Sequence, residues 1–362
     1  MSVRSLNRRV RIKDVAQQAG VSTATVSHVI NKTRFVTEST RDRVLKAIEN
    51  CNYYPNAHAR SLASGRSHTI GLLVSDISNP FFPELVKSIE VAASERGYDI
   101  ILASSNYDSA RTSDYVRRML GRRVAGVLLM TSEVDQQLID ELIDLEVPAV
   151  FYNLEPTGGS VSNVIVDCEI GIDQAISHLA LLGHRRIVHL AGPCSTRAGI
   201  QRLDAFRHSM ARYIPGYSPT IYEGDFRVES GRQAASSMLA AGDFPTAVLA
   251  ANDMMALGLI KELRCAGLSV PRDISVIGFD DIAFAELSDP PLSTVSLPRI
   301  ELGRKVVEAL MLGIDQSSDT PSEFHVSTHL LTRGSTARCP NETGFNRVSE
   351  RLKLDPLSSG SH

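Results

Sequence analysis

The spacing of apolar residues changes once along the chain, and this change divides it into two parts. Near the start, Ile12, Val15, Ala16 and Ala19 recur at intervals of three and four residues, which is typical of an amphipathic helix. From residue 68 onward, short apolar runs such as TIGLLVSD and VAGVLLM alternate with helical stretches such as PELVKSIEVAASERG. That alternation predicts parallel sheets covered by helices on both faces. We therefore expect a small all-α head and a two-lobed, doubly wound α/β body.

The head has the pattern of a helix-turn-helix unit. Gly20 can adopt the positive φ that ends the first helix, and a second helix begins within three residues of it. Thr37 is placed to cap a third helix, in which Val44, Leu45 and Ile48 are expected to complete a small core. Two short helices joined by a tight turn that contains glycine define the motif.

The outward face of the second helix carries small and polar side chains and no acidic residue. Within VSTATVSHVINKTRFV, this face comprises Thr23, Ala24, Ser27, His28 and Asn31. Hydroxyl, imidazole and amide groups on such a helix can reach base edges and phosphates when it enters the major groove of DNA. A solvated helix face is the plainer alternative.

The distribution of charge favours the DNA interpretation. Residues 1–66 contain 12 Lys and Arg against 4 Asp and Glu, whereas the remainder contains 26 against 37. A basic head on an acidic body predicts that the head meets an anion such as nucleic acid. The whole chain, with 43% hydrophobic and 22% charged residues, has the composition of a folded protein with a sizeable core.

The segment between head and body, NAHARSLAS after Pro55, favours a helix but is too short to be stable alone in water. We expect it to fold only against DNA or a partner copy, although a plain linker is an equal alternative. At the other end, from about Gly334, the chain becomes polar and rich in turn residues, and we expect a largely disordered tail.

Motifs for catalysis, cofactors and metals are missing. The sequence has no GxGxxG after a strand, no P-loop, no GxSxG elbow and no HExxH helix, and its five cysteines form no CxxC pair. We therefore expect no catalytic residue, no cofactor and no metal, although an active site assembled without a local motif stays open. With no apolar run long enough to span a membrane and no leader sequence, a cytoplasmic location, associated with the nucleoid, is expected.

The stretch VRIKDVAQQAGVSTATVSHVINKTRFV, the following YYPNAHARSLASG and the βα body together resemble the lactose-repressor (LacI/GalR) family of transcriptional regulators. The resemblance covers residues 11 to 335, and the head is most similar to the purine-repressor and ribose-repressor branch. It implies a DNA-binding head (1–54), a hinge helix (55–67), a two-lobed core like periplasmic sugar-binding proteins (68–335) and a tail (336–362). It also implies a repressor that reads a pseudo-palindromic operator as a homodimer.

The resemblance assigns DNA contacts residue by residue. Base reading falls to Thr23, Ala24 and His28, although Ala24 stands where a hydroxyl is common in the family. The other implied DNA contacts are Thr25, Ser27, Asn31, Arg60 and Leu62. Leu62 matches the hinge leucine that wedges between base pairs and kinks the minor groove.

The resemblance also implies an effector site at the carboxyl ends of the body's strands. The loop SNPFF contributes Asn79, Phe81 and Phe82, and GIQRLDAF contributes Arg202. Further positions are Phe226, Asn252 and Asp280, with Arg197 and Asp167 as weaker candidates.

Polar groups paired with aromatic faces suit a small, hydroxylated, uncharged ligand held between closing lobes. We expect a sugar such as ribose, which would release the repressor from DNA, and a purine co-repressor is the alternative. A sugar-binding sensor without a DNA role and a sugar-processing enzyme are the competing classes.

Overall fold

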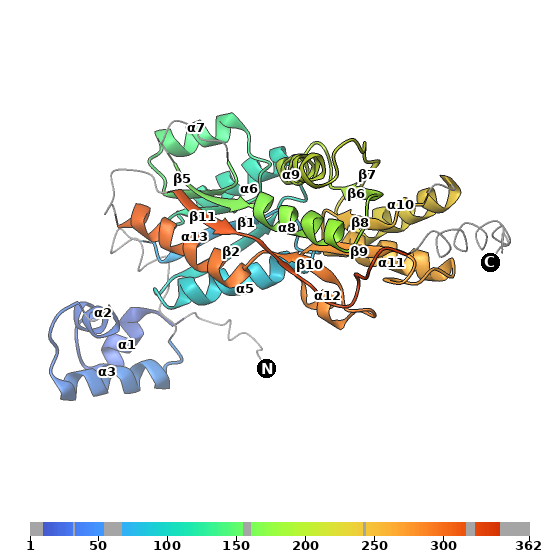
Figure 1. Ribbon diagram of the computed structural model, residues 1–362. Helices are drawn as coiled ribbons and strands as arrows, with labels where there is room; N and C mark the ends of the chain where they lie inside the picture. Colours follow the sequence, from blue (N-terminus) through green and yellow to red (C-terminus); the bar gives the residue numbers. More distant parts are fainter. Residues whose placement is uncertain are drawn as a thin grey trace, which may run out of the picture. The chain divides into compact units, whose positions relative to one another are not determined.

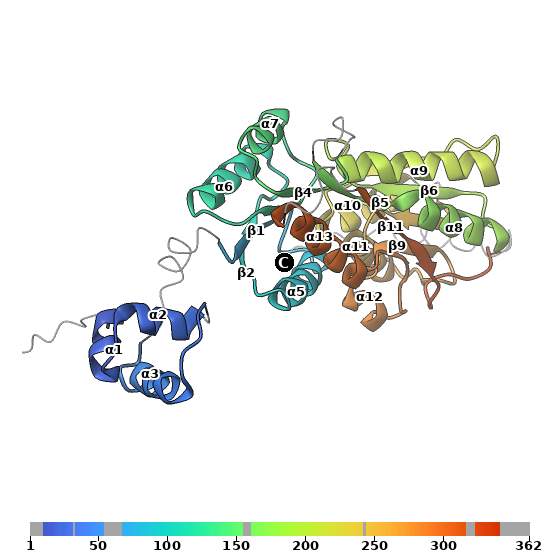
Figure 2. The same ribbon diagram turned by 90° about the vertical axis from the view of Figure 1, so that its left-hand side faces the viewer.

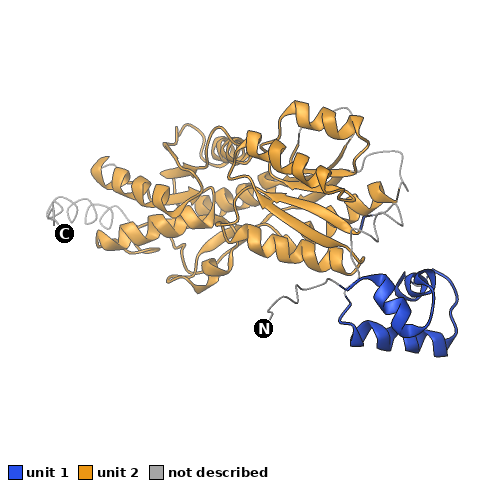
Figure 3. Ribbon diagram, turned by 180° about the vertical axis from the view of Figure 1, so that it is seen from behind, with its two compact units in different colours: residues 1–67 blue, residues 68–362 orange. Residues whose placement is uncertain are grey.

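The computed structural model describes residues 10–31, 33–53, 67–154, 161–241, 244–315 and 323–340. The chain forms two compact units, residues 1–67 and 68–362 (Figure 3). Two of the sequence predictions, the hinge contacts of Arg60 and Leu62, lie outside the described residues.

The first unit is a three-helix head. Its helices are α1 (Ile12–Ala19), α2 (Thr23–Asn31) and α3 (Glu38–Asn50). Gly20 ends α1 with a φ of +63°, and Val15, Val26 and Val44 from the three helices are fully buried together. The prediction for Leu45 is wrong, because this side chain is 46% exposed. One step along a helix turns a side chain by about 100°, so the position after buried Val44 faces outward and Ala47 fills the core instead.

The second unit contains two six-stranded sheets, one in each lobe (Figure 1). The first sheet is entirely parallel, in the order β11 (Glu323–Ser327), β5 (Ser162–Asp167), β4 (Ala149–Tyr152), β3 (Val127–Met130), β1 (Thr69–Val74), β2 (Asp99–Ser104). The second has the order β12 (His329–Leu331), β10 (Ser293–Ser296), β9 (Ser275–Asp280), β8 (Ala247–Ala250), β6 (Ile187–Ala191), β7 (Ile221–Glu223). Its edge strand β12 is antiparallel to β10 and the other pairs are parallel. The predicted doubly wound lobes are confirmed.

Helices cover both faces of each sheet, as Figures 1 and 2 show. The first lobe has α5 (Phe81–Ser94) and α13 (Arg299–Ile314) on one face, and α6 (Ser109–Gly121) and α7 (Gln136–Asp144) on the other. The second lobe has α8 (Cys168–Leu181) and α9 (Arg197–Tyr213) on one face. Its other face carries α10 (Val228–Ala241) and α11 (Asp253–Cys265), and the short α12 (Ala283–Leu287) follows β9. The strands are buried on both sides, which explains their continuous apolar runs.

The chain crosses between the lobes after β5, after β10 and after β11. Thr328, which is 1% exposed, fastens two of these crossings together. Its hydroxyl donates to the carbonyl oxygen of Asp167 at 2.8 Å and accepts the Gly171 N–H at 3.1 Å. The lobes are thus joined by connections that lie side by side and can act as a hinge.

The expected loss of structure from Gly334 is wrong for residues 334–340, which pack on the second lobe. Ser335 is fully buried, and its hydroxyl donates to the carbonyl oxygen of Val276 at 2.5 Å. Further along, the backbone N–H of Cys339 donates to the carbonyl oxygen of Leu182 at 2.9 Å. The polar composition of this segment reflects hydrogen bonds to the lobe.

In the described part of the chain, no helix is both long enough and apolar enough to cross a bilayer.

Candidate functional site

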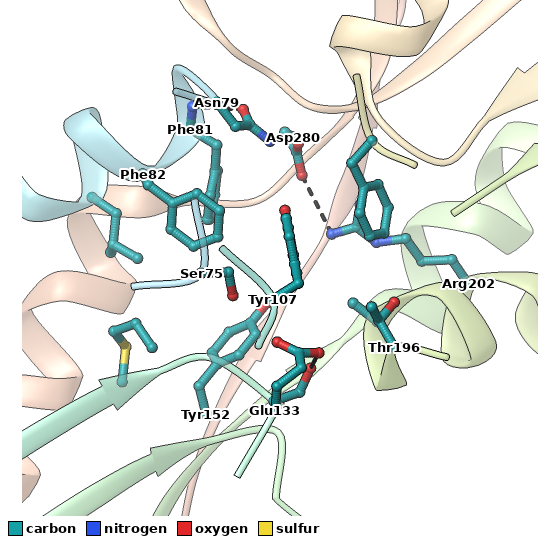
Figure 4. A pocket seen from close by; sticks show the side chains of 15 residues that line it. Ser75, Asn79, Phe81, Phe82, Tyr107, Glu133, Tyr152, Thr196, Arg202 and Asp280 are labelled. Carbon is teal, nitrogen blue, oxygen red and sulfur yellow. Dashed lines mark hydrogen bonds and ion pairs between the residues drawn. The ribbon is translucent and has the colours of Figure 1, made fainter. Parts of the chain in front are cut away.

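A cavity of about 520 Å³, counting its opening to solvent, lies between the two lobes (Figure 4). It is lined by Ser75, Asn79, Phe81, Phe82, Leu85, Tyr107, Met130, Ser132, Glu133, Tyr152, Thr196, Ala198, Arg202, Phe226 and Asp280. Most of these residues stand at or just after the carboxyl ends of strands, where open parallel sheets bind ligands.

Six of the seven predicted effector residues line this cavity: Asn79, Phe81, Phe82, Arg202, Phe226 and Asp280. Asn252 does not line it. Its side chain is buried, accepts the N–H of Met255 at 2.9 Å at the start of α11, and donates to the carbonyl oxygen of Phe226 at 2.8 Å. Asn252 therefore positions the Phe226 loop. Neither of the two weaker candidates, Arg197 and Asp167, lines the cavity. The side chain of Asp167 caps α8 instead.

The central polar feature of the cavity is a buried ion pair. Nη2 of Arg202 lies 3.3 Å from Oδ1 of Asp280, and the two side chains are 10% and 5% exposed. Arg202 also donates to the carbonyl oxygen of Ala251, and its guanidinium lies 3.8 Å from the centre of the Phe279 ring. Burial raises the pKa of Asp280 to about 6, against the opposing effects of Arg202 and Arg299. Removal from water makes the charged carboxylate costly, and the arginines offset part of that cost.

The loop that carries Asp280 is held in an unusual backbone conformation. Asp280 and Asp281 have φ angles of +106° and +59°, a region that favours glycine. Arg299 donates to the carbonyl oxygen of Asp280 at 2.6 Å, and Arg333 donates to Oδ1 of Asp281 at 2.6 Å. The carboxylate of Asp253, fully buried, accepts the N–H of Ile282 at 2.9 Å. Such strain persists where surrounding contacts over-determine it, commonly at ligand sites.

Aromatic rings form the walls. Phe81 and Phe82 meet edge to face at 5.2 Å in the first lobe, and Tyr107 from that lobe lies 5.8 Å from Phe226 of the second. A Cβ atom added at Gly192 would lie 2.3 Å from the Phe226 ring, so only glycine allows the ring its place. The cavity can therefore hold a flat or ring-shaped molecule between aromatic faces, with a fixed donor and acceptor at one end.

Sequence reasoning missed several polar lining residues: Ser75, Tyr107, Ser132, Glu133, Tyr152 and Thr196. Each lies at or shortly after the end of a strand, in β1, β2, β3, β4 or β6. This position could have identified them from the sequence, because open parallel sheets bind ligands at the carboxyl ends of their strands. In the described part of the chain, no group of three or more His, Cys, Asp and Glu is arranged to hold a metal ion.

The predicted DNA-reading face is the outer surface of α2. Thr23 and Ala24 are exposed, and Thr25, Ser27, His28 and Asn31 are half-buried. The amide of Asn31 donates to the hydroxyl of Ser27 at 3.1 Å, and Nδ1 of His28 lies 2.8 Å from the hydroxyl of Thr33. The helix thus presents neutral polar groups in defined orientations, without an acidic residue to repel phosphate.

A helix-turn-helix head followed by a two-lobed binding core defines a ligand-controlled DNA-binding regulator, and comparisons with known proteins agree. The family model "Bacterial regulatory proteins, lacI family" matches residues 11–56, and the "Periplasmic binding protein-like domain" matches residues 176–336. The HTH-type transcriptional repressor PurR of Photobacterium profundum is 39% identical over 326 residues, covering 90% of this chain and 98% of that protein. The PurR repressor of Vibrio vulnificus is 38% identical over 325 residues, covering 89% and 97%.

Solved structures give the same result. The lac repressor dimer bound to operator and the anti-inducer ONPF matches with a TM-score of 0.82 and 31% identity, covering 91% of this chain and 100% of that one. A LacI-family regulator of Enterococcus faecium with bound ribose matches with a TM-score of 0.68 and 30% identity, covering 75% and 99%. The chain belongs to the lacI family of bacterial transcriptional regulators. It is a DNA-binding repressor and not an enzyme, as the sequence predicted.

Proposed function

We propose that this repressor binds a pseudo-palindromic operator as a homodimer and that a small molecule in the interlobe cavity controls its affinity for DNA. The observation that carries the proposal is the buried Arg202–Asp280 pair within an aromatic cavity, in a chain that also has a DNA-binding head. The similar lac repressor, solved as a dimer on its operator, supports both the dimer and the operator.

The effector that we propose is a purine base acting as a co-repressor. The PurR repressors, 38–39% identical over about nine-tenths of the chain, favour this ligand over the sugar expected from the sequence. The cavity is compatible with it, since the rings of Phe82, Tyr107 and Phe226 can stack on a planar base. Arg202 and Asp280 offer a donor and an acceptor to the base edge.

Ribose is the second candidate, because the similar regulator of Enterococcus faecium was solved with ribose bound. The hydroxyls of Ser75, Ser132 and Thr196 could bond a sugar as readily as a base. The two candidates predict opposite effects on DNA binding, since a purine co-repressor strengthens it and an inducing sugar weakens it.

In the proposed mechanism, the ligand favours one arrangement of the lobes over others and thereby one spacing of the two heads. Coupling free energies between such sites are typically about 1–3 kcal/mol, or roughly 5–150-fold in operator affinity. A ligand with equal affinity for both arrangements would change nothing.

Titration calorimetry with hypoxanthine, guanine and ribose tests the assignment. We expect both purines to bind the wild-type protein, and Asp280→Asn to lower their affinity at least tenfold. Glu301→Gln, a substitution on α13 at a residue that does not line the cavity, is the matched control. Ribose binding without purine binding would reject the purine and favour the second candidate.

A further inference from the structure

The first lobe contributes a second carboxylate to the cavity, that of Glu133 in the loop after β3. Its Oε2 accepts the hydroxyl of Thr131 at 2.7 Å, and its Oε1 accepts the hydroxyl of Ser132 at 2.7 Å. Buried Ser75 donates in turn to the hydroxyl of Thr131 at 3.0 Å. Each hydroxyl has one proton to give, so the chain from Ser75 through Thr131 ends at Glu133 and fixes the carboxylate in place.

The position of Glu133 gives the cavity two acidic ends. Figure 4 shows Glu133 and Asp280 on either side of Tyr107. Each Glu133 oxygen has a second lone pair and can accept a further hydrogen bond beyond the one from its neighbour. A ligand that fills the cavity would therefore meet a fixed acceptor at this end.

The charge balance of the cavity is negative. Among the described residues that line it, Arg202 is the one cation, and it is already bonded to Asp280 and to the carbonyl oxygen of Ala251. The tyrosine hydroxyls add no negative charge of their own, since burial raises the pKa of Tyr107 and of Tyr152 above the ordinary value and keeps both neutral. The cavity therefore holds two carboxylates and one guanidinium, whose charge is already paired with Asp280. A phosphate or carboxylate group on the ligand would be repelled by this negative balance.

We propose that Glu133 is an effector-binding residue that accepts an N–H or O–H of the ligand, so that the site takes neutral or cationic donor-bearing molecules and rejects phosphorylated ones. This inference rests on the proposed function for the location of the site and deepens it by naming the ligand's charge class. It separates free bases and free sugars from nucleotides and sugar phosphates. Glu133 thus contacts the ligand from the first lobe, and Arg202 and Asp280 contact it from the second.

Titration calorimetry at pH 7.5 tests the proposal with hypoxanthine, guanine, ribose and ribose 5-phosphate on wild type, Glu133→Gln and Glu141→Gln. Glu141 is the matched control, because it removes the same charge from the same lobe while its carboxylate pairs with Arg117, outside the cavity. Hydrogen bonds to charged groups are among the stronger ones. We expect Glu133→Gln to lower the affinity for the ligand that binds wild type about tenfold or more, equivalent to at least about 1.4 kcal/mol.

If ribose binds wild type, we expect ribose 5-phosphate to bind at least tenfold more weakly, and we expect this difference in affinity to be smaller in Glu133→Gln. If ribose does not bind, we expect no binding of ribose 5-phosphate. Thermal unfolding of the variants, unchanged from wild type, separates loss of a contact from loss of fold. Equal affinities of Glu133→Gln and Glu141→Gln for the bound ligand would overturn the proposal, as would tight binding of ribose 5-phosphate by wild type. If ribose binds and the purines do not, the purine assignment fails while Glu133 is judged on ribose; if no probe binds, both proposals fail.

Discussion

Nε of Arg299 lies 2.9 Å from Oε2 of Glu84, and this ion pair joins α13 to α5 within the first lobe, beside the cavity. Glu84 is in the first turn of α5, two residues after Phe82, and its other oxygen accepts the N–H of Ala283 from the second lobe at 3.3 Å. Arg299 also holds the carbonyl oxygen of Asp280 at 2.6 Å. The two residues of this first-lobe pair thus hold the aromatic wall against two backbone groups of the second lobe, those of Asp280 and Ala283.

Neutralising Glu84 should loosen these contacts between the two lobes. We expect Glu84→Gln to lower effector affinity about threefold to tenfold, because a partly buried charged hydrogen bond is lost from the arrangement in which both lobes contact the ligand. Glu301→Gln is the control, since Glu301 pairs with Lys305 of the same helix. Calorimetry that gives the same affinity for the two variants would show that the ion pair does not act on the ligand.

The pKa of Asp280, raised by burial to about 6, predicts how effector affinity depends on pH. Above pH 6 the carboxylate is ionised and can accept a hydrogen bond from the ligand; below it, protonation removes that acceptor and weakens the pair with Arg202. Affinity should therefore be constant from pH 7 to 8 and fall below pH 6, by up to about tenfold per pH unit. Calorimetry between pH 5 and 8 checks this, and Asp280→Asn should remove the dependence. An affinity that rises toward pH 5 would contradict it.

Replacing Gly192 with alanine should displace the Phe226 ring, which forms part of the cavity wall. The new Cβ would lie 2.3 Å from the Phe226 ring, so the ring must leave its position. We expect Gly192→Ala to lower effector affinity tenfold or more and to cost about 1–3 kcal/mol of stability through overpacking. Gly121→Ala, where the added atom meets nothing within 4 Å, should leave both quantities near wild type. Tight effector binding by Gly192→Ala would exclude Phe226 as part of the binding wall.

His28 on α2 should distinguish operator from random DNA. On the polar outer face of the helix, Nδ1 of its ring lies 2.8 Å from the hydroxyl of Thr33. This hydrogen bond fixes the orientation of the ring, which favours a specific contact with a base. We expect His28→Ala to weaken operator binding by about 1–3 kcal/mol and random-sequence binding much less. Gel-shift titrations on both DNAs measure the difference, with exposed His208→Gln of α9 as the control. Equal losses on operator and random DNA would indicate a phosphate contact only.

The sequence was informative wherever structure follows a local pattern. The helix-turn-helix rests on Gly20 and on periodic apolar residues, and the lobes rest on buried strand runs that alternate with helices. The family resemblance placed Phe82, Arg202 and Asp280 correctly at the cavity. These features depend on neighbours in the chain or on motifs with fixed spacing.

Features that depend on distant parts of the chain were missed. Glu84 and Ala283 are 199 residues apart in sequence and meet only because the two lobes lie against each other, which no local spacing encodes. Glu133 follows a strand like many acidic residues, and its place in the cavity depends on the facing lobe. The family resemblance implied that Asn252 lines the cavity, yet its side chain donates to the carbonyl oxygen of Phe226.

The most direct test is the operator affinity of the wild-type protein, measured by fluorescence anisotropy at one fixed salt concentration with and without hypoxanthine or ribose. The operator is first obtained by selection from random DNA. We expect hypoxanthine to strengthen binding by roughly 5–150-fold, ribose to have no effect, and Asp280→Asn to lose the response that Glu301→Gln retains. Operator affinity that hypoxanthine leaves unchanged and ribose weakens would contradict the purine co-repressor.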